Sequence, residues 1–330
     1  MTPLPLTLAI SEYDHVRDLV SGRVKPEGIA LTSLVLSIEE IFFRFVRYRE
    51  WDVSEMAMGK YVAMRSQGDN SICALPVFPS RVFRQSSVFV RTDSPLRRLE
   101  DLRGKRVGVP EWAQTAAIYT RGFLQHQLGI PLSEIRWVQA GVNEAGRGEK
   151  VALKLPPGVE IERPEDKSLD EMLLAGEIDA AMSAHPPQAF GEGDPRVRRL
   201  VEDFLPLEEA YGRQTGIFPI MHCIAVKSSV LEAHPWVAMN LLAAFEQAKQ
   251  RSVARAFEAT ASRFPIPWTF EHARRARALF GDADYWPYGV AANRITLEAF
   301  LRYAHEQGVC HRLLAPEELF PLEIVSSFKV

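Results

Sequence analysis

Several side chains that could bind an anion or move a proton follow segments that the sequence predicts to be strands. Arg81 comes after the apolar run 72–77, and a guanidinium binds a carboxylate through two parallel hydrogen bonds. Thr115 lies in the first turn of a predicted helix, where free amides and the helix dipole attract an anion. His222 carries an imidazole, which titrates near neutral pH and serves as acid or base. These residues are candidates for binding an acidic ligand and for proton transfer.

Short motifs for other chemistries are missing. The segment 141–150 contains glycines but lacks the Gly-Lys-Ser/Thr of a phosphate loop. No Gly-x-Ser-x-Gly elbow and no His-Glu-x-x-His spacing occurs. The three cysteines, Cys73, Cys223 and Cys310, are widely spaced without a Cys-x-x-Cys pair. They favour reduced thiols in the cytoplasm over a disulfide framework.

The elements that must position these residues alternate between short apolar runs and amphipathic stretches, which indicates an α/β protein. Apolar runs predict strands at 4–10, 29–36, 51–58, 72–77, 86–91, 106–109 and 178–182, and a further strand within 215–226. Ser37 with Glu40 and Ser168 with Glu171 have the spacing of capping boxes, which predicts a helix after each serine. The segment 141–158 is predicted to be a loop.

Length and charge limit the class of protein. A chain of 330 residues predicts two domains. Lys+Arg 39 against Asp+Glu 42 gives a net charge of −3, which disfavours nucleic acid and membrane surfaces as partners. No apolar run reaches the ~20 residues of a spanning helix. The first ten residues lack the basic start and unbroken apolar core of a secretory signal, so we expect a cytoplasmic protein, and a homo-oligomer is an open alternative to a monomer.

We predict two lobes, the second inserted into the first. The first lobe is assigned residues 1–93 and 218–330, and the second lobe residues 94–217. The two chain crossings lie near 88–96 and 213–222. Turns after strands converge between such lobes, so the ligand site is expected in a cleft there.

Several runs of residues resemble known families. Leu99-Glu100-Asp101-Leu102-Arg103-Gly104-Lys105 and Leu174-Ala175-Gly176-Glu177-Ile178-Asp179-Ala180 resemble pieces of type II periplasmic-binding-protein folds. More specific runs lie at 53–56, 76–84, 115–122, 215–222 and 286–289: Val-Ser-Glu-Met, Pro-Val-Phe-Pro-Ser-Arg-Val-Phe-Arg, Thr-Ala-Ala with Arg-Gly, Thr-Gly-Ile-Phe-Pro-Ile-Met-His and Trp-Pro-Tyr-Gly. In the same order and over nearly the whole chain, they resemble the 4,5-dihydroxyphthalate decarboxylase family. The chain departs from that family's pattern at His15, Gln85 and His185.

The resemblance implies an enzyme that removes one carboxylate from a small aromatic dicarboxylate, giving protocatechuate and carbon dioxide without an organic cofactor. Direct loss of the carboxylate would leave an unstable phenyl carbanion. Each carboxylate is para to a hydroxyl, however, and deprotonating that hydroxyl allows the ring carbon to be protonated first. Such a site needs cations for the retained carboxylate, a base at the phenol, a proton donor over the ring and exclusion of water.

The resemblance suggests roles for individual residues, each with a structural alternative. Arg81, assisted by Arg84, would bind the retained carboxylate; the alternative is a surface or interlobe salt bridge. Thr115 would add anion binding or only cap its helix. His222 would be the proton donor or base, or a structural hydrogen-bonded residue. Glu55 would orient His222 or act as the phenol base, or pair with Lys60 or an arginine.

Other candidates come from the predicted turns. Tyr13, Asp14 and His15 would contact the catechol hydroxyls, although Asp14 could equally cap a short helix. His185 would supply the ring proton from the second lobe on closure, or pack beside two prolines. Tyr288 would hydrogen-bond the substrate or only pack.

Two rival interpretations remain open at this point. A divalent metal ion held by His15, Glu55, His185 and His222 could chelate the catechol oxygens as a Lewis acid. The fold also permits a solute-binding module that holds an aromatic or small carboxylate without chemistry.

Overall fold

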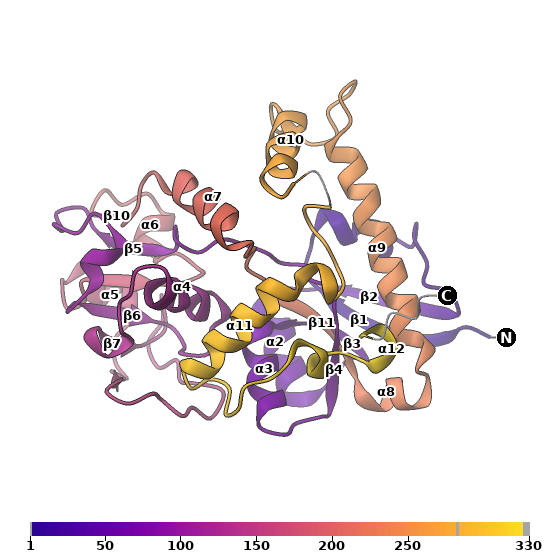
Figure 1. The fold of residues 1–330 in the computed structure, drawn as a ribbon, viewed down its shortest axis with the longest axis horizontal. Coiled ribbons are helices and arrows are strands. Elements are labelled where there is room, and N and C mark those ends of the chain that lie inside the picture. Colours follow the sequence, from indigo (N-terminus) through magenta and orange to yellow (C-terminus); the bar gives the residue numbers. More distant parts are fainter. Residues whose placement is uncertain (1, 282–283, 326–330) are drawn as a thin grey trace.

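The computed structural model describes residues 2–281 and 284–325, which form two β-sheets with helices around them (Figure 1). The sheet of the first lobe has the spatial order β2–β1–β3–β11–β4. Its strands are β1 (Leu4–Ile10), β2 (Ile29–Val35), β3 (Val53–Ala57), β4 (Ile72–Leu75) and β11 (His222–Lys227). Strand β1 is parallel to β2 and β3, whereas β11 is antiparallel to β3 and β4. Strand β11 therefore returns the chain to this sheet after the chain has passed through the second sheet.

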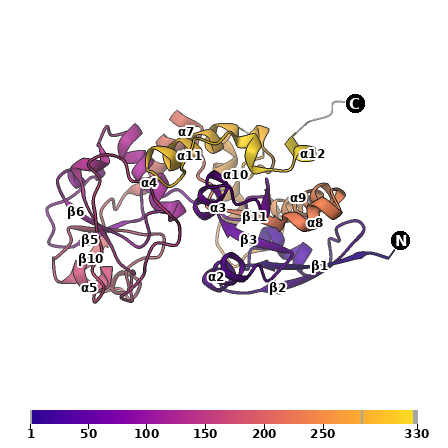
Figure 2. The same ribbon diagram turned by 90° about the horizontal axis from the view of Figure 1, so that it is seen from below.

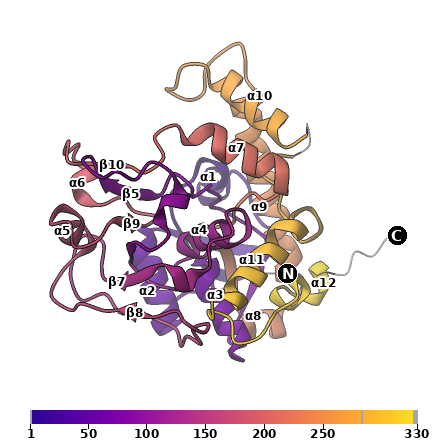
Figure 3. The same cartoon turned by 60° about the vertical axis from the view of Figure 1, so that its left-hand side comes forward.

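The sheet of the second lobe has the order β10–β5–β9–β6–β7–β8 and lies beside the first (Figure 2). Figure 3 brings it to the front. Its strands are β5 (Val88–Arg91), β6 (Arg106–Val109), β7 (Arg136–Gln139), β8 (Ile161–Glu162), β9 (Ala180–Met182) and β10 (Val197–Arg199). Strands β6 to β9 pair in parallel, while β5 is antiparallel to both of its neighbours.

The helices divide between the lobes in the same way as the strands. Those of the first lobe are α1 (Arg17–Val20), α2 (Ile38–Tyr48), α3 (Met58–Ser66), α8 (Ser228–Ala233), α9 (Trp236–Ala256), α10 (Thr269–Leu279), α11 (Arg294–Glu306) and α12 (Leu322–Val325). Those between the two crossings are α4 (Thr115–His126), α5 (Leu169–Leu174), α6 (Gln188–Gly191) and α7 (Phe204–Thr215). Helix α11 packs on both α3 and α4, so it contacts the two lobes at once. Within the described residues, no helix combines the length and the apolar character needed to cross a membrane.

Local sequence signals predicted many of these elements correctly. Strands β1 and β6 have the predicted bounds. The Ser37 hydroxyl accepts a hydrogen bond from the Glu40 N–H at the start of α2. Ser168 and Glu171 form a complete capping box before α5. These signals act within four residues, so tertiary packing had little opportunity to override them.

The division between the lobes differs from the prediction at one strand. Strand β5, at 88–91, pairs with β9 and β10 in the second sheet, although it was assigned to the first lobe. The sequence of an apolar strand does not indicate which sheet the strand joins. Here the partner strand, β9, lies about 90 residues later in the chain. Residues 1 and 326–330 of the predicted first lobe lie outside the described part of the chain.

Candidate functional site

Glu55, His222 and Tyr13 form one hydrogen-bonded cluster at the edge where β3 ends and β11 begins. Strand β11 pairs with β3 so that Ile224 is opposite Glu55 and His222 is opposite Ala57. Long side chains in such diagonal positions on one face of a sheet can touch. His222 Nδ1 lies 2.6 Å from Glu55 Oε1, and the Tyr13 hydroxyl donates to the same oxygen at 2.6 Å. Glu55 is thus paired with His222, and the alternative pairing with Lys60 is wrong.

The cluster holds Glu55 as a charged acceptor. Its side chain is 0% exposed, and the Ser11 N–H donates to Oε2 at 2.9 Å. Burial raises the pKa of Glu55, but the hydrogen bond and charge of His222, with the bonds from Tyr13 and Ser11, outweigh it and keep the pKa below its usual range. Because the carboxylate is charged, the hydrogen-bond pattern assigns a proton to His222 Nδ1. This leaves His222 Nε2 for another partner.

Tyr13 is a donor in this cluster and not a base. Burial, followed by the negative charge of Glu55, raises the pKa of the Tyr13 phenol far above its usual value. The hydroxyl therefore stays protonated at neutral pH. Its other neighbours are the Ser80 hydroxyl, which is hydrogen-bonded to it, and His222 Nδ1 at 3.4 Å.

The turn of residues 79–81 links this cluster to the other candidates. The Pro79 carbonyl is hydrogen-bonded to His15, and the Ser80 hydroxyl to Tyr13. The Ser80 carbonyl accepts from the backbone just before β11 at 2.8 Å. One turn therefore contacts the side chains of Tyr13 and His15 and the backbone that leads into β11.

His15 is held neutral beside the cluster. Its ring lies 5.2 Å from that of Tyr13 and 5.4 Å from that of Trp286, measured between centroids. Burial lowers the pKa of His15 to about 4, more than the Pro79 carbonyl and the nearby acids raise it. Its Nε2 is buried and has no hydrogen-bond partner among the described residues. The ring is neutral, and Nε2 is the nitrogen free to hydrogen-bond a ligand hydroxyl.

Arg81 is buried without a carboxylate partner in the described part of the chain. It is 5% exposed, and one terminal nitrogen donates to the side-chain oxygen of Asn293. The guanidinium carbon lies 4.9 Å from the centroid of the Phe218 ring and 5.7 Å from that of Phe78. Burial lowers the pKa of Arg81 to about 10, so it remains charged at neutral pH. The predicted alternative of a salt bridge is not found here.

Arg84 is a half-buried arginine with a weak set of partners. Its Nε donates to Met221 Sδ at 3.2 Å, and burial lowers its pKa to about 10. Among the ion pairs of residues 2–281 and 284–325, none involves Arg84. The neighbouring Gln85, where the family pattern has histidine, is buried and accepts from the Arg84 N–H at 3.2 Å. Gln85 therefore shapes the backbone next to Arg84.

Thr115 takes part in a contact between the lobes. Its hydroxyl accepts a hydrogen bond from the Gly59 N–H at 2.9 Å, which joins α4 to the start of α3. The N-cap of α4 is Gln114, so Thr115 does not cap the helix. A Cβ added to Gly59 would lie 2.4 Å from the Ala113 carbonyl oxygen. The two helix starts are in close contact here.

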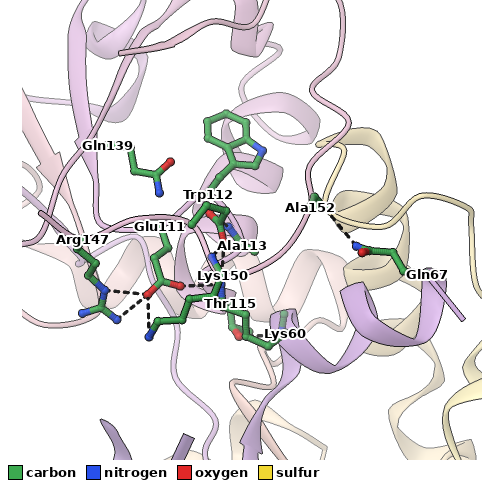
Figure 4. A network of polar contacts seen from close by, with 12 residues as sticks. Lys60, Gln67, Glu111, Trp112, Ala113, Thr115, Gln139, Arg147, Lys150 and Ala152 are labelled. Atoms are coloured by element: carbon green, nitrogen blue, oxygen red, sulfur yellow. Dashed lines mark hydrogen bonds and ion pairs between the residues drawn. The ribbon is translucent and has the colours of Figure 1, made fainter. Parts of the chain in front are cut away.

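A buried ion cluster lies next to Thr115 (Figure 4). Lys60, on α3, pairs with Glu111 at 2.6 Å and with Glu149 at 2.7 Å, both from the second lobe. Arg147 also pairs with Glu111, at 2.7 Å. Lys60 and Glu111 are 8% and 3% exposed. The cluster therefore fastens one lobe to the other, and the predicted loop 141–158 supplies three of its charges, Arg147, Glu149 and Lys150.

His185 and Asp14 have partners outside the Glu55 cluster. His185 Nε2 lies 2.8 Å from Glu39 Oε1, and both side chains are more than half exposed. This contact also joins the second lobe to the first. Asp14 accepts hydrogen bonds from Ser252 at 2.6 Å and from Arg255 at 2.8 Å, both on α9. Asp14 thus fastens the first turn to α9, and His185 contacts solvent and a surface acid.

Tyr288 lies near Arg81 and presents an unused hydroxyl. The residue is buried, and its hydroxyl has no hydrogen-bond partner among the described residues. Burial raises the pKa of Tyr288 far above its usual value, so it is a donor. Lys249 Nζ lies 4.7 Å from the centroid of its ring. Three buried polar atoms in this region, His15 Nε2, Arg81 Nε and the Tyr288 hydroxyl, are therefore unpartnered within the described chain.

The hypothesised metal ligands do not gather as a set. In residues 2–281 and 284–325, no group of three or more His, Cys, Asp and Glu side chains is placed to hold a metal ion. Glu55 and His222 are hydrogen-bonded to each other, and His185 pairs with Glu39. A metal ion at Glu55 would have to displace these hydrogen bonds.

Two surface hollows have defined linings. One of about 230 Å³ is lined by residues 11–14, which include Tyr13 and Asp14, and by Val35. The other, about 740 Å³, lies between α11 and residues 313–318 and is lined by none of the predicted site residues. Volume alone therefore does not identify the site, and the unpartnered polar groups are the better guide.

Sequence reasoning missed Asn293, Ser80 and the Ser11 N–H. Asn293 and Arg81 are 212 positions apart, and a neutral amide carries no signal of its role. Ser80 lies within the Pro-Ser-Arg run that marked Arg81, so its place beside a candidate was the one available signal. Every residue except proline has a backbone N–H, so the residue type at position 11 does not indicate that this N–H is a hydrogen-bond donor in the site.

Solved structures with the same arrangement of two lobes define the class of protein. The periplasmic aliphatic sulphonate-binding protein SsuA of Escherichia coli superposes with a TM-score of 0.55 at 12% identity, over 97% of this chain and 92% of that chain. The desulfurization enzyme DSZB gives a TM-score of 0.53 at 15% identity, over 98% and 97%. The chain therefore has the α/β fold of the periplasmic solute-binding proteins, as predicted.

Sequence comparison then identifies the family. No family model matches the sequence. The chain is 37% identical over 331 residues to the 4,5-dihydroxyphthalate decarboxylase of Comamonas testosteroni, with 100% of both chains covered. It is 39% identical over 204 residues to that of Pseudomonas putida, covering 62% of this chain and 79% of that protein. The chain belongs to the 4,5-dihydroxyphthalate decarboxylase family, which confirms the resemblance.

Proposed function

We propose that this protein is a non-oxidative decarboxylase, a carboxy-lyase, that converts 4,5-dihydroxyphthalate to protocatechuate and carbon dioxide. Two relatives at 37% and 39% identity carry that activity in their names. The observation that carries the proposal is the buried Glu55–His222 pair, 2.6 Å apart, beside a buried arginine without a counter-ion in the described chain. This combination provides a proton carrier and an anion-binding group.

The reaction requires a proton at the ring carbon before the carboxylate leaves. Removal of the proton from the para hydroxyl moves negative charge onto that carbon. Protonation of the carbon gives a dienone in which carbon dioxide is a stable leaving group, and its departure restores the aromatic ring. The electrons of the broken carbon–carboxylate bond stay on the ring, so the departure of carbon dioxide gives a phenolate, which then takes up a proton. One proton leaves the phenol, one enters the ring and one returns to the phenolate, so each turnover consumes one proton and needs no oxidant. The enzyme has to supply a base, an acid and a cation.

We assign the ring proton to His222 Nε2. Nδ1 is bonded to Glu55, so the carboxylate orients the imidazole and stabilises its protonated form. The side chain is 15% exposed, which leaves it accessible to a ligand. Phe42 contacts the His222 ring edge-on at 4.9 Å between centroids and limits the access of water.

The catechol hydroxyls have an acceptor in His15. Its Nε2 is buried and unpartnered among the described residues, so a phenol proton directed at it would make its first hydrogen bond. Tyr13 stays protonated and positions Glu55. In this assignment Glu55 orients His222, while His15 receives the phenol hydrogen bond. The hypotheses that Asp14 and His185 contact the substrate gain no support from their partners, Arg255 and Glu39.

Arg81 and Arg84 provide the charge for the substrate dianion. Arg81 is buried and Arg84 is half-buried, and neither forms an ion pair with an acidic side chain within the described chain. A phthalate carries two carboxylates, so two such cations match its charge. Tyr288 would add a hydrogen bond beside Arg81.

The proposed route uses no organic cofactor. The alternative is a divalent ion at Glu55 and His222 that chelates the catechol oxygens. Treatment with a chelator followed by dialysis separates the two: full activity in the treated protein supports the proton-transfer route, and restoration only by added metal supports the alternative.

A cytoplasmic location accords with three free thiols, two of them buried. The number of chains in the assembly is a separate question, which light scattering can answer.

Turnover tests the function directly. Purified protein is incubated with 4,5-dihydroxyphthalate, and protocatechuate is measured by chromatography. Phthalate, which has no hydroxyl to deprotonate, is the control and should yield no product. Recovery of the hydroxyphthalate unchanged from a tight complex would reject the enzyme and favour a solute-binding module.

A further inference from the structure

Asn293 contacts Arg81 through an amide whose orientation is fixed. The residue ends the short helix η4 (Ala291–Asn293) and is 2% exposed. Its Nδ2 donates to the carbonyl oxygens of Pro287 at 2.9 Å and of Gly289 at 2.7 Å. Both amide hydrogens are therefore used, and Oδ1 accepts from a terminal nitrogen of Arg81. Two backbone carbonyls thus determine which end of the amide faces the guanidinium.

The charge of Arg81 is not neutralised by the protein around it. Asp284 is the acidic residue among the groups whose charge acts on the pKa of Arg81. Asp284 is already bonded to Lys249. The aromatic faces of Phe218 and Phe78 stabilise the cation without cancelling its charge. Arg81 Nε remains buried with no partner among the described residues.

We propose that Asn293 is a positioning residue that holds Arg81 through a neutral hydrogen bond, so that the guanidinium charge stays available for a carboxylate of the substrate. This inference rests on the proposed function, because the ligand it assigns to Arg81 is the aromatic dicarboxylate. Asparagine and aspartate have nearly the same shape. The difference between them at position 293 is the charge that would pair with Arg81.

The physical argument is one of charge balance. A buried cation is costly unless it is paired, and an aspartate at 293 would lower that cost in the empty protein. The same aspartate would leave an incoming carboxylate with no net charge to bind and with a buried anion nearby. An amide oxygen keeps the guanidinium in place while leaving the balancing charge to the ligand.

The test is Asn293→Asp, assayed with one charged and one neutral ligand. Phthalate is the unreactive dianion, and its binding is measured by calorimetry. Catechol carries the two hydroxyls without carboxylates, and its inhibition constant is measured kinetically. We expect phthalate affinity to fall by at least about 10-fold and catechol inhibition to be unchanged. KM for 4,5-dihydroxyphthalate should rise more than kcat falls.

Asn240→Asp is the matched control. Asn240 lies on α9, and its amide also donates to a backbone carbonyl, that of Glu27, at 2.9 Å. It should bind both ligands like the parent protein. Equal weakening of phthalate and catechol in Asn293→Asp would mean that Asn293 only maintains the structure, and this outcome overturns the proposal. Unchanged phthalate binding overturns it as well.

A second variant keeps the proposal testable should Asn293→Asp not fold. Arg81→Met removes an uncompensated buried charge, so the ligand-free protein should melt at the same or a higher temperature. Phthalate should then no longer raise the melting temperature. Arg255→Met is the contrast, because Arg255 is paired with Asp14 and Asp18, and its melting temperature should fall. A fall in melting temperature of similar size in Arg81→Met would show that the charge of Arg81 is compensated in the ligand-free protein, and this would overturn the proposal.

These measurements separate the inference from the proposed function. Binding of phthalate that depends on Asn293, in a protein that releases no carbon dioxide, would retain the anion site and reject the decarboxylase. If the parent protein turns over 4,5-dihydroxyphthalate and Asn293→Asp binds phthalate as tightly as the parent, the inference about Asn293 is rejected and the proposed function is retained.

Discussion

In the proposed mechanism, proton transfer at His222 depends on a carboxylate, that of Glu55, that water does not reach. Glu55 accepts from His222, Tyr13 and the Ser11 N–H, and these bonds keep it ionised in spite of its burial. An ionised Glu55 holds the proton on His222 Nδ1, which directs Nε2 toward a ligand. The orientation of the imidazole and its readiness to carry a proton therefore have one cause.

His222→Asn tests that role. Asparagine can still bond Glu55 but cannot carry a proton to the ring carbon. We expect kcat to fall by about 10²- to 10⁴-fold, with KM and melting temperature little changed. The exposed His272 on α10 supplies the control His272→Asn, which should keep full activity. A kcat within a few-fold of the parent would remove His222 as the proton carrier.

His15 makes stability depend on acidity in a defined direction. Burial lowers the pKa of His15 to about 4 in the folded chain, whereas an unfolded histidine titrates near 6.5. The unfolded state therefore takes up the proton first as pH falls. The contribution of His15 is complete above about pH 6.5 and is lost as pH falls toward 4, by up to about 3 kcal/mol.

His15→Asn removes this proton uptake and can retain the bond to the Pro79 carbonyl. The free energy of unfolding, measured with denaturant between pH 4 and 7, should therefore fall less in the variant than in the parent. Identical pH dependence in the two proteins would contradict a buried neutral His15.

Residue type and local context were enough to propose some of these positions. Arg81 was proposed because a guanidinium after a central strand is suited to a carboxylate, and His222 because an imidazole can carry a proton. The structure places Glu55 within β3 and His222 at the start of β11, where the two side chains are hydrogen-bonded. Asn293 was not predictable, because its function depends on the absence of a charge. His185, a position where the chain departs from the family pattern, was expected in the site because of its predicted turn, but it pairs with Glu39, a partner that no local pattern indicates.

At the scale of elements, the starts of α3 and α4 meet where the lobes touch. The Gly59 N–H donates to Thr115 Oγ1, and the Ala113 carbonyl lies where a side chain at position 59 would begin. Strong local signals predicted α3 and the helix after Ser168. Strands β7 and β10 were missed because they are short and contain arginines, so their pairing in the sheet outweighs their weak sequence pattern.

Gly59→Ala distinguishes packing from helix propensity. Alanine in a helix normally stabilises by about 0.5–1 kcal/mol relative to glycine. Here the added Cβ would lie 2.4 Å from the Ala113 oxygen, so we expect a lower melting temperature and a higher KM. Gly148→Ala, where a Cβ meets nothing within 4 Å, should be neutral. A stabilised Gly59→Ala would show that the helices do not meet as described.

At the scale of the whole molecule, polar contacts hold the lobes together at several points, among them the bonds from Trp112 Nε1 to the Gln307 carbonyl at 2.7 Å and from Arg121 Nε to Gln307 Oε1 at 2.9 Å. Lys60 reaches Glu111 and Glu149 across the boundary (Figure 4), while α11 packs on helices of both lobes. The buried pair is the stronger fastening, because the exposed His185–Glu39 pair is screened by water and salt. Closure of the lobes therefore depends on Lys60 more than on any surface ion pair.

Lys60→Met removes the buried fastening. The methionine keeps much of the side chain's volume, Glu111 retains Arg147 and Lys150, and the cross-lobe attraction is lost. Breaking a buried pair from one side costs about 3–5 kcal/mol, so the lobes should separate more readily. We expect a larger radius of gyration by small-angle X-ray scattering, a higher KM, and compaction on adding phthalate. Lys167→Met, which breaks an exposed pair with Glu177, should leave all three unchanged. An unaltered radius and KM in Lys60→Met would assign lobe closure to the apolar contacts of α11 instead.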